Sequence, residues 1–132
     1  MITMPDYKYG LGIIFNENPD NLDIADGVAL DGIVDCIHKV IIEKDVMFGH
    51  ETAIFTGGHD YNKFGEERKA SNGGGAVTIH EGVWVASRAM IIGPSEIGKH
   101  AVIGAGSVVR GNVPEYAMVI GNPANVIRYI KH

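Results

Sequence analysis

The 132-residue sequence has a single cysteine, Cys36, and no excess of basic residues. One cysteine cannot form an internal disulfide, so we expect the protein in a reducing, cytoplasmic compartment. Lys and Arg together number 11 against 16 Asp and Glu, which gives a net charge of −5. Because an acidic chain has little positive surface with which to neutralise a phosphate backbone, nucleic acid is not an expected partner.

The sequence also lacks a long apolar run. Glycine or a charged residue interrupts every apolar stretch well before the roughly 20 residues needed to span a bilayer. The N-terminal residues Met1 to Tyr9 contain Asp6 and Lys8 where a signal peptide would need an apolar segment. We therefore expect a cytoplasmic protein with no membrane partner.

A period of six residues runs through the second half of the chain. Aliphatic residues recur at every sixth position from residue 79, namely Ile79, Val85, Ile91, Ile97, Ile103 and Val109. Four places after each comes a small or short β-branched residue, namely Val83, Ala89, Ser95, Ala101, Ser107 and Val113. All twelve positions obey the rule, so the repeat is the strongest signal in the sequence.

An earlier block follows the same rule. Its aliphatic series is Ile24, Leu30, Cys36, Ile42, Phe48 and Ile54, and its small series is Val28, Val34, Val40, Val46 and Thr52, with Gly58 as the one departure. Cys36 is therefore predicted to be a core residue. Neither a helix nor ordinary strand alternation has a period of six, whereas a short strand plus a corner does, so the chain is predicted to wind as an all-β solenoid.

The two blocks are out of register by one residue, because Ile54 and Ile79 are 25 positions apart. The polar segment 60–76 between them is predicted to be an extended loop that leaves the coil. We expect one domain over 1–132, built as an N-terminal cap (1–23), first coils (24–59), the loop (60–76), later coils (77–114) and a short C-terminal segment (115–132). Both terminal segments are expected to cover open strand edges.

Several local motifs resemble one family. They are Phe55 to Tyr61 (Phe-Thr-Gly-Gly-His-Asp-Tyr), Val77 to Ala86, Ile103 to Val109 and Gly121 to Arg128. Together with the repeat they resemble the hexapeptide-repeat acetyltransferases, in the branch of galactoside, maltose and xenobiotic O-acetyltransferases. The resemblance covers about 24–128 and implies a left-handed parallel β-helix, a triangular solenoid with three repeats per coil, although right-handed crossovers are the usual rule.

His59 is the candidate catalytic residue. In a strand centred on an inward aliphatic residue the neighbours point outward, which predicts an outward side chain at position 59. The resemblance implies that this histidine is the general base. An imidazole can take a proton from an attacking hydroxyl or amine and return it to the departing thiolate, without a metal. Loop acids Asp60, Glu66 and Glu67 are candidates to orient the ring.

The donor is expected to be acetyl-CoA, bound as a co-substrate. Ser87 and Ala105 are 18 residues apart, one full coil, so they should stack on one edge where an extended pantetheine can bond to backbone groups. The resemblance implies that these two positions contact CoA and that Trp84 lies near the thioester. Arg110 and Arg128 are predicted to pair with the CoA phosphates. Gly111 and Asn125 stand where the family often has basic residues.

The acceptor side carries fewer signals. Asp31 and Asp35 lie where the family often places an acidic or amide residue at the acceptor hydroxyl. Asp60 and Tyr61, which follow the candidate base, complete the predicted substrate contacts. The identity of the acceptor stays open.

The predicted function is transfer of acetyl from acetyl-CoA to a sugar or glycan hydroxyl, in a homotrimer whose active sites lie between subunits. N-acetylation of an amino group on a nucleotide sugar is the main alternative. A carbonic anhydrase would need converging histidines with a close pair, and the histidines at 38, 50, 59, 80, 100 and 132 include none. A non-catalytic scaffold with a threonine ladder is disfavoured, because Thr occurs only at 3, 52, 56 and 78.

Overall fold

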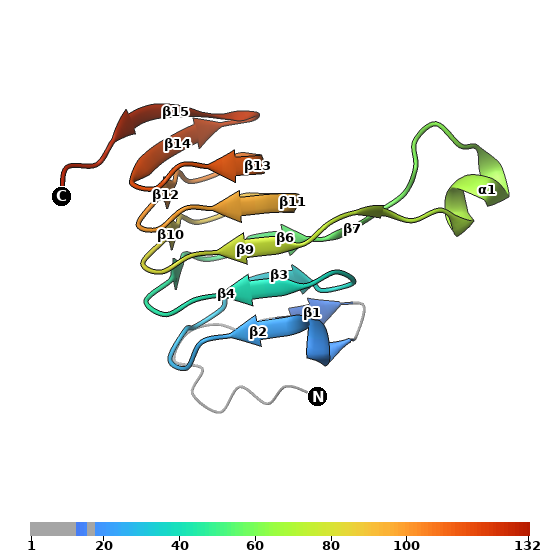
Figure 1. Cartoon of the computed structure of the whole chain (residues 1–132), viewed down its shortest axis with the longest axis horizontal. Helices are drawn as coiled ribbons and strands as arrows, with labels where there is room; N and C mark the ends of the chain where they lie inside the picture. The colour runs from blue at the N-terminus through green and yellow to red at the C-terminus, as the bar shows by residue number, and fades with distance from the viewer. Residues whose placement is uncertain (1–12, 16–17) are drawn as a thin grey trace.

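Short parallel strands stack into a solenoid with three flat faces (Figure 1). The structure, a computed structural model, describes residues 13–15 and 18–132. A short 3-10 helix, η1 (Pro19–Asn21), leads into the first complete coil. In this part of the chain no helix has the length and apolar character that crossing a bilayer requires.

Each face is a ladder of strands from successive coils. The first face contains β2 (Leu22–Ile24), β4 (Val40–Ile42), β9 (Val77–Ile79) and the ends of β11 (Met90–Ile97) and β13 (Val108–Val113). The second contains β1 (Ile13–Phe15), β3 (Gly32–Asp35), β6 (Thr52–Phe55) and the starts of β11 and β13. The third contains β5 (Met47–Phe48), β10 (Trp84–Val85), β12 (Val102–Ile103), β14 (Ala117–Gly121) and the antiparallel β15 (Ala124–Tyr129).

The repeat residues form the core of the solenoid. All twelve members of the later series are buried, from Ile79 through Val113, and Cys36 is fully buried as well. In the earlier series Ile24, Val28 and Phe48 are only partly buried and pack against this core. The predicted fold class, an all-β left-handed parallel β-helix of hexapeptide repeats with one extended loop, is confirmed.

The strict six-residue register fails at two corners. Val34, which the spacing assigned to a small position, pairs in register with Ile54, so it takes the place in the stack that was expected for Cys36. Val113 likewise pairs with Ile97 and not with Ser95. The reason is that corner lengths differ. Paired residues of β3 and β6 are 20 positions apart in the sequence, whereas paired residues at the ends of β11 and β13 are 16 positions apart. Both side chains stay buried because the strands still alternate.

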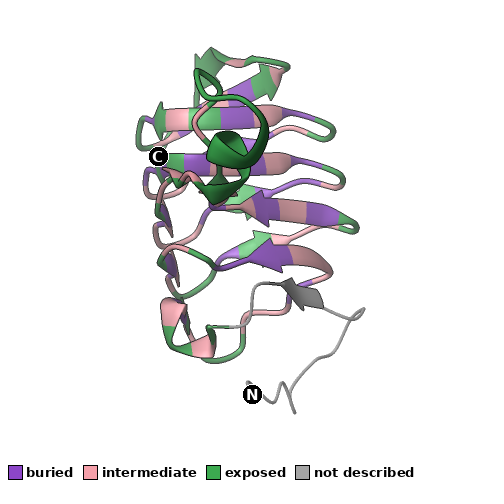
Figure 2. Ribbon diagram, turned by 90° about the vertical axis from the view of Figure 1, so that its right-hand side faces the viewer, coloured by how far each residue is buried: buried purple, intermediate pink, exposed green. Residues whose placement is uncertain are grey.

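The segment between the blocks forms an arm, defined here as residues 57–74. A two-stranded antiparallel ribbon of β7 (Gly57–Gly58) and β8 (Gly73–Gly74) leaves the coil and ends in the short helix α1 (Gly65–Ala70). Figure 1 shows it projecting from the side of the solenoid, and Figure 2 shows its exposed helix in front of the stacked strands. The predicted loop therefore leaves the coil as expected, but it contains regular structure.

The parallel stacking extends beyond the expected coil boundaries at both ends. β2 begins at Leu22, and β14 continues the third face after Pro114. β15 then folds back along β14 and covers its free edge, which agrees with the need to protect the last strand of a solenoid. Residues 1–12 and 16–17, most of the predicted N-terminal cap, lie outside the described residues.

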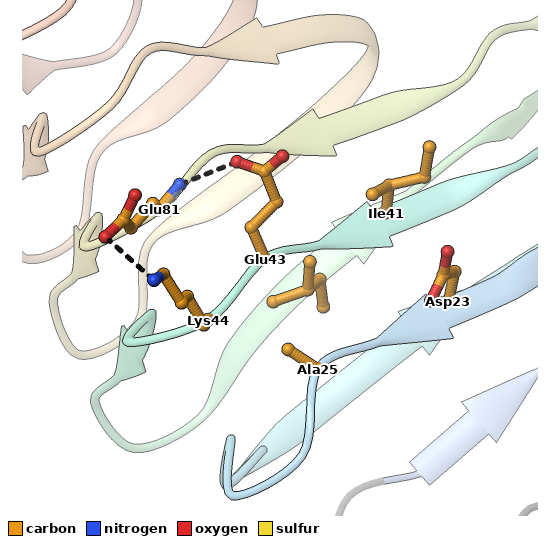
Figure 3. A pocket seen from close by; sticks show the side chains of 7 residues that line it. Asp23, Ala25, Ile41, Glu43, Lys44 and Glu81 are labelled. Carbon is orange, nitrogen blue, oxygen red and sulfur yellow. Dashed lines mark hydrogen bonds and ion pairs between the residues drawn. The ribbon is translucent and has the colours of Figure 1, made fainter.

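The corner between the first and third faces is held by a charged cluster around His80. Its Nδ1 lies 3.0 Å from Glu43 Oε1 and its Nε2 lies 2.8 Å from Glu96 Oε1. The hydrogen bond to Glu96, followed by that to Glu43, raises the pKa of His80 against the opposing effect of its partial burial. Beside this cluster, over β2 and β4, is an open pocket of about 490 Å³, in which Lys44 and Glu81 lie within ion-pair distance (Figure 3).

We expect His80→Gln to lower the free energy of unfolding in a pH-dependent way. A histidine whose pKa is raised on folding stabilises the fold fully below its ordinary value near 6.5, and this contribution is lost as the pH rises through the higher folded value. Because the partners are partly exposed, the loss should be about 1 kcal/mol at pH 6 and smaller at pH 9. Urea unfolding at both pH values measures it. His100→Gln, at a ring that contacts Tyr116, is the control, and an equal loss at both pH values for His80→Gln would contradict this account.

Candidate active site

His59 is the first residue after β7 and lies at the base of the arm. Its ring is exposed, and Nδ1 lies 3.0 Å from the backbone carbonyl oxygen of Ser71. Because a carbonyl can only accept a hydrogen bond, Nδ1 carries the proton and Nε2 keeps its lone pair. A neutral imidazole in this tautomer can accept a proton from a bound hydroxyl.

The return strand of the arm is fixed to the coil by two hydrogen bonds that follow Ser71 in the chain. His38 Nε2 donates to the carbonyl of Gly73 at 2.8 Å, and Gly75 N–H donates to the carbonyl of Thr56 at 2.9 Å. The hydroxyl of Ser71 accepts a hydrogen bond from the N–H of Asp60 at 2.8 Å. These bonds hold the carbonyl that orients His59. Sequence reasoning missed His38 and Ser71 because their roles depend on how the arm folds back.

Asp60 and Glu66, two of the three candidate loop acids, bond elsewhere. Asp60 Oδ1 accepts from the N–H of Asn62 at 2.9 Å, and Glu66 forms an ion pair with Lys69 at 2.8 Å on the surface of α1. Nδ1 of His59 therefore bonds to a backbone carbonyl, where the sequence had pointed to a carboxylate. A carbonyl orients the ring and fixes the tautomer without adding a negative charge beside it.

The outer part of the arm presents aromatic side chains. Tyr61 and Phe64 are 80% and 76% exposed, respectively. Arg68 lies over the Phe64 ring, with its guanidinium carbon 5.3 Å from the ring centre, and donates to the carbonyl of Tyr61 at 3.0 Å. Asp60 and Tyr61, the predicted acceptor contacts, follow His59 directly in the same arm.

The two upstream aspartates lie at different edges. Asp35 is buried at the edge next to the arm, where its carboxylate accepts hydrogen bonds from the N–H groups of Ile37 at 3.0 Å and Gly57 at 2.9 Å. It therefore braces the strand that leads to His59. Asp31 lies at the other end of β3, where its carboxylate contacts the ring of His50.

Ser87 and Ala105 stack as predicted, along a line called here the small-residue edge, which joins the third face to the second. It comprises residues 49–51, 86–88 and 104–106. Gly106 N–H donates to the carbonyl of Ser87 at 3.0 Å, which places the two turns on successive coils. Ala105 is exposed and Ser87 partly exposed.

Trp84 and Arg128 share the third face, next to this edge. Trp84 is 46% exposed and pairs in register with Met47 and Val102. Val102 pairs in turn with Met118, and Met118 pairs with Arg128. Arg110 does not join this group, because it ends the second-face part of β13, in register with Ile92, on the side of the arm. Within one chain, therefore, the predicted acetyl-CoA contacts of the third face lie on a different side of the solenoid from the arm that carries His59 (Figure 1).

Comparison with known proteins matches this fold to transferases. Residues 76–111 match the family profile described as bacterial transferase hexapeptide (six repeats). The Saccharomyces cerevisiae protein YJL218W is 36% identical over 98% of this chain and 63% of its own length. Galactoside O-acetyltransferase from Lactococcus lactis is 30% identical over 92% of this chain and 52% of its own length.

Among solved structures, maltose O-acetyltransferase from Clostridium difficile superposes with a TM-score of 0.76 at 25% identity, covering 93% of this chain and 70% of the other. The chain spans less than two thirds of the length of the curated relatives it matches, 63% and 64% for two of them. The repeat, the fold and these similarities agree: the chain carries the bacterial transferase hexapeptide repeat and is similar to hexapeptide-repeat acetyltransferases, with galactoside and maltose O-acetyltransferases among its relatives.

Proposed function

We propose that this chain is a subunit of a CoA-dependent acyltransferase that transfers acetyl from acetyl-CoA to a hydroxyl of a sugar or glycan. The observation that carries the proposal is His59, an exposed imidazole whose Nδ1 bonds to the Ser71 carbonyl and whose Nε2 keeps its lone pair. The names of the relatives support both the acyl group and the class of acceptor.

The reaction is a direct transfer. Nε2 of His59 takes the proton of the acceptor hydroxyl while its oxygen attacks the thioester carbonyl carbon. The tetrahedral intermediate collapses by breaking the carbon–sulfur bond, and the protonated imidazole returns the proton to the departing thiolate. The products are an acetyl ester and CoA with a free thiol, and the step needs no metal.

The site lies between subunits of a homotrimer in this proposal. His59 and Trp84 are on different sides of one solenoid, so a single thioester can reach both only if neighbouring chains supply them. A flat-faced solenoid also needs a second wall to enclose a ligand, and a closed ring of three identical chains supplies it. Asp60 and Tyr61 would then face the acceptor from the chain that carries the base.

Acetyl-CoA is proposed to lie along the small-residue edge. Its pantetheine would bond to the backbone at Ser87 and Ala105, with the thioester near Trp84 and the phosphates toward Arg128. Arg110, on the arm side, would approach the same phosphates from the neighbouring chain. Asp35 would act on the acceptor only through the arm that it braces.

Arg128→Ala should raise the dissociation constant for CoA about tenfold, because it removes one charge-assisted hydrogen bond to a phosphate. Turnover at saturating acetyl-CoA should change little, since Arg128 lies away from the arm. Isothermal titration and initial rates measure the two effects. Lys44→Ala removes an exposed cation from the corner at Glu81 and is the matched control. Equal affinity for CoA in both variants would contradict the phosphate role.

An acceptor screen tests the proposed function. The chain is incubated with acetyl-CoA and galactosides, maltose or amino sugars, and thiol release is followed together with the mass of the product. We expect thiol release that depends on a sugar hydroxyl and an acetyl ester as product. An amide formed only with amino sugars would replace O-acetylation by the N-acetyl alternative, and no thiol release with any acceptor would contradict the proposal.

A further inference from the structure

The small-residue edge carries a second oriented imidazole, at His50. Nδ1 of His50 contacts Oδ2 of Asp31, so a proton on Nδ1 is donated to the carboxylate and Nε2 keeps its lone pair. The His50 side chain is 75% exposed, whereas that of Asp31 is 23% exposed. The carboxylate is therefore used to hold the ring, and Nε2 is accessible to a ligand.

The backbone fixes His50 directly beside Ser87. The N–H of His50 donates to the hydroxyl of Ser87 at 3.1 Å, and the N–H of Arg88 donates to the carbonyl of His50 at 2.8 Å. A Cβ on Gly49 would lie 2.5 Å from the backbone nitrogen of Ser87, so only glycine allows the two coils to approach this closely. His50, Ser87 and Ala105 thus stand on successive coils of one edge.

If the proposed function holds, the order of these residues fixes the direction in which CoA lies along the edge. A CoA molecule with its phosphates toward Arg128 and its pantetheine at Ala105 and Ser87 points its thioester toward the coil of His50. The acceptor must meet the thioester at that end. In a cleft between chains, His50 is then on the opposite wall from the base, His59.

We propose that the Asp31–His50 pair binds the acceptor and selects a hydroxyl-bearing carbohydrate. Nε2 of His50 accepts a hydrogen bond from a sugar hydroxyl, and Asp31 holds the ring in the tautomer that can do so. The sequence had assigned the acceptor contact to Asp31 itself. In this geometry the carboxylate acts through the imidazole, so Asp31 is a positioning residue and His50 makes the contact.

The test compares two acceptors of the same enzyme, water and a sugar. Acetyl-CoA hydrolysis without sugar is measured beside acetyl transfer to methyl galactoside or maltose, whichever the wild-type protein acetylates. We expect His50→Ala to raise the KM for the sugar about tenfold, the effect of one lost hydrogen bond, and to change hydrolysis less than twofold. Asp31→Asn should act in the same direction, and the double variant should be no worse than His50→Ala, because the two residues act as a unit.

The neighbouring pair Glu51 and Arg88 provides the control. It joins the same two coils on the same edge, with Arg88 Nε 2.5 Å from Glu51 Oε2, but holds no imidazole. Arg88→Gln should leave the sugar KM unchanged. The inference is overturned if His50→Ala leaves the sugar KM unchanged, if it lowers transfer and hydrolysis equally, or if the wild type acetylates neither sugar while hydrolysing acetyl-CoA. A wild-type protein that neither hydrolyses nor transfers would instead overturn the proposed function, and this inference with it.

Discussion

Replacing His59 by alanine should lower the rate constant of acetyl transfer by about 10² to 10⁴ and leave the affinity for CoA nearly unchanged. The loss follows from chemistry, because no group would remain to take the proton of the acceptor. The affinity is spared because the proposed CoA contacts at Ser87 and Ala105 lie on a different edge of the chain from the arm. Steady-state rates at saturating acetyl-CoA and a titration with CoA measure the two quantities.

His100→Ala is the control for this variant, because it removes an imidazole that packs against Tyr116 and lies far along the chain from the arm. Its rate should stay close to that of the wild type. Should His59→Ala retain more than about a tenth of wild-type turnover on its best acceptor, the base is another residue.

Gly74→Ala should remove most of the activity although it changes no group that touches substrate. Gly74 has φ +78°, and a Cβ there would lie 1.9 Å from the carbonyl oxygen of Thr56. That oxygen accepts the hydrogen bond from Gly75 that ties the arm to the coil. The ribbon must move to relieve the overlap, and the carbonyl of Ser71 moves with it. A displacement of about 1 Å at a catalytic group can cost about 10² in rate, which is the loss we expect.

Gly27→Ala separates this effect from backbone strain. Gly27 has φ +80°, so both variants force alanine into the left-handed region, at about 1 to 2 kcal/mol each. A Cβ on Gly27 meets no atom within 4 Å, and the residue is far from the arm along the chain. Turnover and thermal unfolding are measured for both. If the two variants are equally active, the position of the arm does not control His59.

The repeat allowed the core to be predicted because burial in a solenoid depends on spacing alone. Each residue from Ile79 to Val109 in the six-residue series is buried, since every strand presents its central side chain inward. The exchange of Val34 for Cys36 in the stack was not predictable in the same way. It depends on the length of a corner, and corners of this solenoid gain or lose two residues while both side chains remain in the core.

The candidate site was predictable where a residue acts from its own strand and unpredictable where two segments must meet. Trp84 is exposed on its own strand, as alternation requires. His59 is exposed as well, but it lies in the arm, and the Ser71 carbonyl reaches it only because the arm returns as a ribbon. The pair of Asp31 and His50 had a signal that was missed: the residues are 19 positions apart, close to one coil. Arg110 was grouped with Arg128 by charge, although the two lie on different sides of the chain.

The most direct test of the proposed enzyme is an experimental structure of the protein with acetyl-CoA bound. The account predicts three chains around a common axis, with CoA in the cleft between two of them. The pantetheine should run along Ser87 and Ala105 of one chain, and the thioester should lie within reach of Nε2 of His59 of its neighbour. Acetyl-CoA bound away from this edge, or a complex in which no His59 approaches the thioester, would contradict it.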